Sequence, residues 1–410
     1  MADALIIDAC RTPRGIGKQG KGALAAMHPQ HLGATVLKAL AERSGINTAE
    51  VDDIIWGTST QRGTQGGDLG RMAALQAGYD IRSSGVTLDR FCGSGITTVN
   101  LAAASIMSGM EDLMIAGGTE MMSMTATLRD GPGIIDSGNL DLRAIHPQPH
   151  QGICADAIAT LEGIPRSALD ALALESQQRA AAAIAGGHFS KSLVTVFGSD
   201  GRPLLAHEEF PRPQTTAEGL AGLNPAFAKL ADLALDERGT TFRGLIAQKY
   251  PDLDINFVHH AGNSSGVVDG AAALLLASPS YAKKNGLKAR ARVVAWANVG
   301  DSPTLMLNAP VPAARKVLAK AGLTVDDIDL WEINEAFAVV AEKFIRDLKL
   351  DRSKVNVNGG AMALGHPIGA TGSILIGTML DELERRDLKR GLVTMCAAGG
   401  MAPAIIIERV

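Results

Sequence analysis

Apolar and polar residues alternate along the first third of the chain in blocks that have the lengths of strands and helices. An apolar run at 4–13 predicts a buried strand, and the helical spacing of apolar residues at 31–45 predicts an amphipathic helix. A second strand is predicted at 50–58, and a glycine-rich loop and an alanine-rich helix follow it. Residues 96–109 are small and apolar on most sides, which predicts a buried helix, and 112–120 predicts a central strand. This alternation predicts an α/β fold around a largely buried sheet.

The pattern changes between about Met121 and Gln248. Turn residues and prolines alternate there with helical patches such as 167–187 (SALDALALESQQRAAAAIAGG), without a strand–helix rhythm. We predict an inserted loop domain over 121–248, because insertions of this length on a regular scaffold often build ligand sites.

The strand–helix rhythm returns after 291–300 (ARVVAWANVG) and repeats the first half of the chain. Residues 314–332 copy 36–57, and in this copy Gly322 falls on Gly45. A repeat of this length is typical of two similar domains, and chance similarity in an alanine- and glycine-rich chain is the alternative. The predicted halves are residues 1–120 plus 249–280, and residues 281–410.

A similar offset carries FCGSGITT onto GHPIGATG, so that Cys92 falls on His366 and Gly95 on Gly369. Each half thus places a reactive side chain, a thiol or an imidazole, at the same strand-to-helix corner. If the halves pack about a pseudo-twofold axis, the two corners meet.

Composition narrows the class of protein. The chain has 410 residues, of which 46% are hydrophobic, and a formal net charge of -4, so we expect two or three domains and no nucleic-acid partner. No uninterrupted apolar run reaches the roughly 18 residues of a membrane span, and the first residues lack the order of a signal peptide. We therefore expect a cytoplasmic protein without membrane insertion. Four cysteines without a C-x-x-C pair indicate neither a zinc site nor a disulfide framework.

The corner at Cys92 carries the strongest candidate chemistry. We expect Gly93, Ser94 and Gly95 to let the chain turn sharply into a helix, leaving the sulfur near free N–H groups. A helix N-terminus stabilises an anion by about 0.3–2 kcal/mol, which lowers a thiol pKa by only about 0.2–1.5. A base is therefore needed, and His366 is the candidate that the repeat supplies. A small buried hydrophobic cysteine is the alternative.

Four further residues, in three segments, are candidates. His366 precedes Pro367 within a glycine frame, although a lone histidine is often structural. Cys396 ends a strand before a glycine pair and is either an acid/base thiol or a core residue. Asn334 and Glu335 in WEINEAFA offer an amide and a carboxylate at a strand–helix junction, or simply a helix cap.

Five segments, in order over about 320 residues, together resemble the thiolase family: CGSG, AGNSSGVVDGAAALLL, NEAFA, NVNGGAMALGHPIGATG and CAAGGMAPAIIIERV. The resemblance implies two duplicated halves in five layers, α-β-α-β-α, with an inserted loop domain. It also implies acyl-CoA and CoA as substrates, no metal or other cofactor, and a homodimer or homotetramer.

The resemblance assigns a role to each matching catalytic position. Cys92 would be the nucleophile that carries the acyl group, and His366 would activate it and help to bind a thioester oxygen. Cys396 would be the second acid/base, and Asn334 would hold a water that forms one oxyanion hole with His366. The backbone N–H groups of Cys92 and Ala398 would form the other.

The resemblance also implies a substrate pocket. Ser265 in GNSSG would lie near the pantetheine amide, and His150 in PHQG would line the pocket. Two positions depart from the family pattern: Ala398 replaces a usual glycine, which matters if the position needs φ > 0, and Gln151 replaces a frequent methionine. The second departure puts the acyl specificity in doubt.

Rival functions remain open at this point. A condensing enzyme of the ketoacyl-synthase type would use two histidines, and a non-catalytic acyl-CoA-binding protein would need no thiols; the Cys–His–Cys set with NEAF favours a thiolase. We predict an acyl-CoA C-acyltransferase that cleaves 3-ketoacyl-CoA with CoA, or runs the reverse Claisen condensation, by a ping-pong mechanism through an acyl-cysteine. Segments 154–164 and 176–189 favour the degradative, β-oxidation direction over a biosynthetic acetyl-CoA acetyltransferase.

Overall fold

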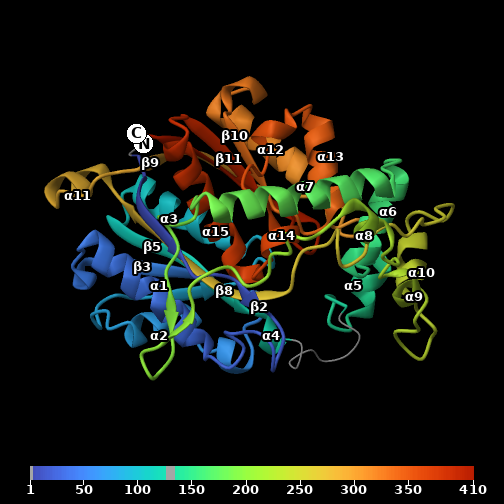
Figure 1. Ribbon diagram of the computed structural model, residues 1–410, viewed down its shortest axis with the longest axis horizontal. Coiled ribbons are helices and arrows are strands. Elements are labelled where there is room, and N and C mark those ends of the chain that lie inside the picture. The colour runs from blue at the N-terminus through green and yellow to red at the C-terminus, as the bar shows by residue number, and fades with distance from the viewer. Residues whose placement is uncertain (1–2, 126–133) are drawn as a thin grey trace.

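The computed structural model describes residues 3–125 and 134–410 (Figure 1). One mixed sheet runs through both halves in the order β10-β11-β12-β9-β1-β8-β5-β3-β4. A short strand, β2 (Gly15–Ile16), adds to β8. The strands of the main path are β1 (Leu5–Arg11), β3 (Asp53–Gly57), β4 (Val86–Leu88), β5 (Leu113–Met121), β8 (Val268–Ala277), β9 (Ala291–Gly300), β10 (Leu330–Ile333), β11 (Arg390–Thr394) and β12 (Met401–Arg409).

The two parts of this sheet share one topology. In the first, β3 pairs with β5 in parallel, and β8 and then β1 follow in antiparallel pairs. In the second, β10 pairs with β11 in parallel, and β12 and then β9 follow in antiparallel pairs. The parts join where β1 pairs with β9. The duplication in the sequence is therefore a duplication of the fold.

The helices complete five layers, as predicted. Helices α3 and α15 pack on each other and on strands of both halves, whereas α1 and α2 cover the first half and α12 and α13 the second. In Figure 1 most of the first half is blue to teal, its strand β8 is yellow to gold, and most of the second half is orange to red. The bounds are α1 (Pro29–Ser44), α2 (Leu69–Gln76), α3 (Ser94–Ser108), α11 (Pro279–Lys284), α12 (Pro310–Ala321), α13 (Ala338–Leu348), α14 (Ala361–Leu364) and α15 (Ile368–Arg385).

The two inner helices are apolar nearly all round because both of their sides face protein. Ile96 and Val99 of α3 share one core with Leu375 and Ile376 of α15. Each such side chain contributes about 1.5–3 kcal/mol by leaving water. This core fixes where the two helices begin, and the candidate catalytic side chains lie at those ends.

In its described residues, 121–125 and 134–248, the inserted region holds one long helix, several short helices and a two-stranded hairpin. Its longest helix, α7, packs against α13 and α14 of the second half, and Figure 1 shows it crossing that half while α5, α6, α8, α9 and α10 lie beyond it. The numbered domain boundaries remain a prediction. The elements are α4 (Met122–Thr125), α5 (Leu140–Ile145), α6 (Gln151–Leu161), α7 (Arg166–Ala185), β6 (Val196–Phe197), β7 (Pro203–Leu205), α8 (Ala217–Ala221), α9 (Ala228–Ala231) and α10 (Phe242–Ala247).

A buried ion pair ties the inserted region to the first half. The carboxylate of Glu208 lies 2.7 Å from the guanidinium of Arg11 on β1 and 2.9 Å from that of Arg14.

No helix among residues 3–125 and 134–410 is both long and apolar enough to cross a bilayer.

Candidate active site

The N-terminal turns of α3 and α15 cross in direct backbone contact. A Cβ atom added to Gly95 would lie 2.7 Å from the backbone nitrogen of Ser373, and one added to Gly372 would lie 2.1 Å from that of Ile96. The hydroxyl of Ser373 also donates to the carbonyl of Gly95 at 3.1 Å. Only glycine allows this approach. The two corners that the repeat equates, those of Cys92 and His366, therefore lie at one place.

The bend before α3 differs from the expectation that the glycines would make it. The left-handed residue is Phe91, with φ 49°, whereas Gly93 has φ -76°. Such a conformation costs about 1–3 kcal/mol for a non-glycine residue. Ser94 supports it, since its hydroxyl donates to the carbonyl of Phe91 and accepts from the N–H of Arg90. The expectation was wrong because Gly93 supplies space instead: a Cβ there would lie 2.8 Å from Pro403.

The thiol of Cys92 is buried just before α3, with 4% of the residue exposed. Burial, with smaller contributions from the charges of Glu120 and Asp89, raises its pKa to about 12, although hydrogen bonds from the backbone N–H groups of Cys92 and Ala398 act to lower it. Desolvation thus outweighs the help that the helix N-terminus was expected to give. In the free protein at neutral pH Cys92 is a thiol, so the need for a base is greater than the sequence indicated.

Cys396 and Ala398 lie on the loop between β11 and β12, close to Cys92. Burial raises the pKa of Cys396, and the charge of Cys92 raises it further, so the two thiols interact. Ala398 keeps an ordinary φ, because the left-handed conformations of this loop fall on Gly399 and Gly400, each with φ 76°. Alanine is therefore accommodated without strain, and its N–H still faces the Cys92 sulfur.

His366 is held in one tautomer by Thr371, a residue that the sequence analysis missed. The Thr371 hydroxyl donates to the carbonyl of Pro367 at 2.9 Å, so it accepts from Nδ1–H of His366 at 2.7 Å. Nε2 is then the unprotonated nitrogen, which is the one that can act as a base. Burial lowers the pKa of His366 to about 4, so the imidazole is neutral at pH 7.

Asn334 faces that nitrogen. Its Nδ2 lies 3.4 Å from Nε2 of His366, and its backbone N–H donates to the carbonyl of Thr394 on β11. Its Oδ1 is buried and has no hydrogen-bond partner in the described part of the chain. The structure thus forms two groups. Asn334 lies against His366, and Cys92 lies against Ala398 and Cys396. No hydrogen bond joins Cys92 to His366 among the described residues; they are related through the crossing of α3 and α15.

Glu120 at the end of β5 is a second residue that the sequence analysis missed. Its carboxylate accepts from the N–H of Ser59 at 2.8 Å and from that of Gly369 at 2.9 Å. Gly369 is the second residue of α15, so a first-half carboxylate holds the start of the helix that His366 precedes. The available signal was an acidic residue closing the otherwise apolar strand predicted at 112–120.

The predicted pocket residues lie near the Asn334 segment. His150 caps α6 by accepting from the N–H of Gly152, and its ring packs 5.5 Å from that of Phe227. Phe227 in turn packs 5.9 Å from Phe337, which belongs to the NEAF motif. Gln151 is the first residue of α6.

Ser265 lies on a segment that connects the site to a surface hollow. Its N–H donates to the carbonyl of Ala336, and the next residue, Gly266, accepts from the N–H of His366 at 2.9 Å. The hollow, of about 210 Å³, is lined in part by Arg212, Gly262 and Met362. It therefore adjoins both the Ser265 segment and the segment that leads to His366.

The other two cysteines are core residues. The sulfur of Cys10 donates to the carbonyl of Val36, and that of Cys154 donates to the carbonyl of Thr304, each at 3.3 Å. Within the described ranges, no cluster of three or more His, Cys, Asp or Glu side chains could hold a metal ion.

Two buried thiols, an imidazole and an amide lie together at the junction of the duplicated halves, a set of groups that can support acyl transfer. The family profile described as "Thiolase, N-terminal domain" matches residues 4–232, and "Thiolase, C-terminal domain" matches residues 287–409. The chain belongs to the thiolase family, and it is a C-acyltransferase.

Relatives that align over the full length of the chain support the assignment to this family. An acetyl-CoA acetyltransferase of Chromobacterium violaceum is 41% identical, over 99% of this chain and 100% of its own. The steroid 3-ketoacyl-CoA thiolase FadA6 of Mycobacterium tuberculosis is 40% identical, over 100% of this chain and 95% of its own. The crystal structure of a Bacillus anthracis acetyl-CoA acetyltransferase superposes with a TM-score of 0.85 at 34% identity, covering 100% of this chain and 99% of that one.

Proposed function

We propose that this enzyme cleaves 3-ketoacyl-CoA with CoA, and catalyses the reverse condensation, through an acyl group on Cys92. The observation that carries the proposal is the placement of the Cys92 thiol against the N–H of Ala398 and beside Cys396, at the crossing that also brings in His366. CoA thioesters are the substrates, and the chemistry uses no metal or other cofactor.

In the cleavage direction His366 Nε2 takes the proton of Cys92 as the sulfur attacks the 3-keto carbon. The bond between C2 and C3 breaks, the acyl group stays on Cys92, and Cys396 protonates the α-carbon of the departing acetyl-CoA enolate. Cys396, now a thiolate, deprotonates CoA, whose sulfur attacks the acyl-cysteine. The bond between the acyl group and Cys92 breaks, the acyl-CoA leaves, and His366 returns its proton to the Cys92 thiolate. The raised pKa of Cys396 suits a proton donor to a carbanion.

Two sets of donors stabilise the negative oxygens. The N–H groups of Cys92 and Ala398 flank the sulfur, so they serve the oxygen of the acyl group attached there. Asn334 and the His366 ring, once protonated, serve the enolate oxygen. The buried Oδ1 of Asn334 has no hydrogen-bond partner among the residues that the structure describes, which supports a bound water at this position. Each donor in such a site is worth about 2.7–4 kcal/mol.

The hollow beside Arg212 suits the nucleotide end of CoA. The guanidinium of Arg212 can bind phosphate groups. The Ser265 segment leads from the hollow toward Asn334 and His366. The acyl chain would then extend toward His150 and Gln151.

The degradative direction is the one we propose, supported by the name of the steroid 3-ketoacyl-CoA thiolase; the names of the acetyl-CoA acetyltransferases favour the biosynthetic alternative. A thiolysis profile across 3-ketoacyl-CoA chain lengths, with a cyclic or steroid-derived thioester included, separates them. We expect a longer or cyclic substrate to exceed acetoacetyl-CoA in kcat/KM by at least about 10-fold. A preference for acetoacetyl-CoA alone would support the biosynthetic alternative.

Replacing Cys396 with serine should separate the two half-reactions. A single turnover should still form acyl-Cys92 from a simple acyl-CoA, whereas deuterium exchange at the acetyl-CoA methyl group should slow at least about 100-fold, because a hydroxyl is a poor base near neutral pH. Both are measured beside the wild type. Equal loss in the two assays, or exchange at the wild-type rate, would mean that Cys396 is a structural thiol.

We also propose a homo-oligomer, either a dimer or a tetramer. Strand β4 is an edge of the sheet whose Val86 is 46% exposed, and Leu101 is 45% exposed on the otherwise buried α3. Apolar edges of this kind are usually covered. Light scattering should give a mass at least twice the 42.6 kDa of one chain, and a monomer would exclude the proposal.

A further inference from the structure

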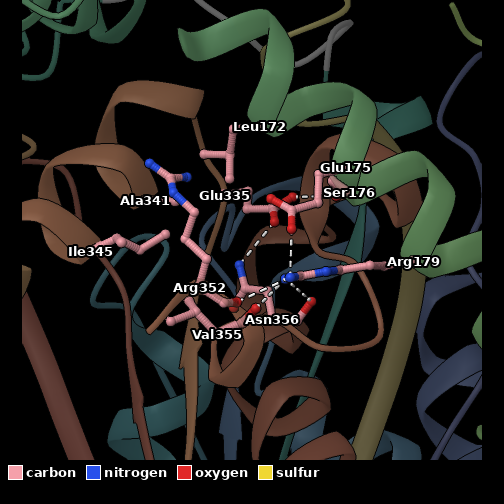
Figure 2. Close-up of a pocket in the computed structure, with 10 residues that line it drawn as sticks. All are labelled: Leu172, Glu175, Ser176, Arg179, Glu335, Ala341, Ile345, Arg352, Val355 and Asn356. Carbon is pink, nitrogen blue, oxygen red and sulfur yellow. Dashed lines mark hydrogen bonds and ion pairs between the residues drawn. The ribbon is translucent and has the colours of Figure 1, made fainter. Parts of the chain in front are cut away.

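Glu335 follows Asn334 in the chain, but its side chain points away into a buried polar cluster. Figure 2 shows its carboxylate facing Ser176 and Asn356, with Arg179 and Glu175 nearby. Ser176 Oγ donates to Oε2 at 2.7 Å, and Asn356 Nδ2 donates to Oε1 at 2.9 Å. A third donor, the N–H of Met362, lies 3.2 Å from Oε2. With 1% of the residue exposed, this carboxylate is satisfied by protein groups alone.

The three donors come from segments that matter for the site. Ser176 lies on α7 of the inserted region, whereas Asn356 and Met362 belong to the segment 355–366, which ends at His366. Asn356 is fixed in turn, because its Oδ1 accepts from the N–H of Ile333 and its Nδ2 donates to the carbonyl of Ile333, each at 2.9 Å. Glu335 therefore joins the end of β10 to the segment that carries His366.

The glycine pair of NVNGG is explained by this carboxylate. A Cβ atom on Gly360 would lie 2.3 Å from Cδ of Glu335, and the N–H of Gly360 donates to Ser176 Oγ at 3.0 Å. Gly359 has φ 75°, and a Cβ there would lie 2.5 Å from the carbonyl oxygen of Ser176. The segment can wrap this closely around Glu335 only with glycine at both positions.

Burial opposes the negative charge of Glu335, and its hydrogen-bond donors and Arg179 favour it. Burial raises its pKa, and the hydrogen bonds from Ser176, Asn356 and Met362, together with the charge of Arg179, lower it. Arg179 also donates to the carbonyls of Val355 and Asn356, so it binds the same segment from α7.

We propose that Glu335 is a positioning residue that locks the segment 355–366 against Asn334, so that Asn334, through the water that it holds, and His366 Nε2 serve one substrate oxygen. The 3.4 Å separation of those two atoms is the geometry that it maintains. The inference rests on the proposed function, since it concerns the oxyanion hole of that reaction. Glu335 itself contacts no substrate.

Glu335→Gln tests this with little change of volume. The new amide NH₂ must face either Asn356 Nδ2 or the Ser176 and Met362 donors, and Asn356 cannot turn over without losing both bonds to Ile333. We expect kcat for thiolysis to fall roughly 10- to 100-fold while KM changes less than about 3-fold, because misplaced groups act on the transition state. The control, Glu175→Gln, alters a carboxylate of the same cluster that pairs with Arg179, and it should keep kcat within about 2-fold of wild type.

A double-mutant cycle with Asn334→Ala distinguishes positioning from general loss of structure. If Glu335 acts by setting the placement of Asn334 relative to His366, its effect disappears once the Asn334 side chain is removed, and the double variant should be no slower than Asn334→Ala alone, within about 2-fold. Multiplying effects, or wild-type kinetics for Glu335→Gln, would overturn the inference. A wild-type enzyme without thiolysis, or a fully active Asn334→Ala, would instead overturn the proposed function.

A milder variant covers the case in which Glu335→Gln does not fold. Ser176→Ala removes one donor to Glu335 from α7, and we expect a several-fold loss of kcat, about 3- to 10-fold, with the same lack of additivity with Asn334→Ala. Additive effects in that cycle would overturn the inference as well.

Discussion

Cys92→Ala should lower thiolysis on the order of 10⁴-fold or more while leaving the fold intact. Alanine removes the sulfur that accepts the acyl group, and the donors at Ala398 and His366 cannot replace a bond-forming atom. The side chain is small and buried, so circular dichroism and the thermal midpoint should stay close to those of the wild type. The measurement is steady-state consumption of a 3-ketoacyl-CoA in the presence of CoA.

Cys154→Ala is the matched control for this experiment. Cys154 is also buried, but its sulfur bonds to the carbonyl of Thr304 and not to a group of the proposed catalytic set. Cys154→Ala should retain turnover within about 10-fold of the wild type, and any loss of turnover should match its loss of folding stability. A Cys92→Ala enzyme that still turned over at a comparable rate would exclude Cys92 as the nucleophile.

His366→Asn should produce the second largest loss. Asparagine keeps a polar group near Thr371 but removes Nε2, the base for Cys92 and the donor to the enolate oxygen. General base catalysis contributes about 10²–10⁴-fold, and an oxyanion donor contributes about 10²–10³-fold in kcat. We therefore expect a fall in kcat on the order of 10⁴-fold, measured in the same assay.

The pH dependence of Cys92 alkylation by iodoacetamide follows from the two pKa values. The pKa of His366 is lowered to about 4, so its neutral, proton-accepting form is present above that pH and is lost as the pH falls through it. The pKa of Cys92 is raised to about 12, so without the base the thiolate fraction rises about 10-fold per pH unit across the neutral range. In His366→Asn the alkylation rate should show this steep rise. In the wild type the rate should be higher between pH 6 and 9 and should depend less on pH. Superimposable profiles would mean that His366 does not activate the thiol.

Much of the fold follows from patterns that one segment carries by itself. The strand predicted at 112–120 is β5, and the buried helix predicted at 96–109 is α3, because a long apolar block bounded by turn residues has few alternatives. The internal repeat then predicts that the Cys92 and His366 corners meet, since duplicated halves tend to pack symmetrically.

Several contacts of the site join residues far apart in the chain. Glu120, which sequence reasoning missed, bonds to Gly369, and Glu335, which the sequence offers only as a junction carboxylate or helix cap, bonds to Ser176; no local spacing encodes either contact. Phe91 shows the opposite difficulty. Local composition assigned the bend to the glycines, yet glycine is needed at those positions because Pro403 and Ser373, about 300 residues further along the chain, pack against them. Side chains that position others are therefore visible only once the halves are packed.

Peptide mapping by mass spectrometry after incubation with an acyl-CoA alone, without CoA as acceptor, tests the central claim most directly. The acyl group should be found on the peptide that contains Cys92, and it should be removed when CoA is added. An adduct on Cys10, Cys154 or Cys396, or turnover without any covalent adduct, would contradict the account.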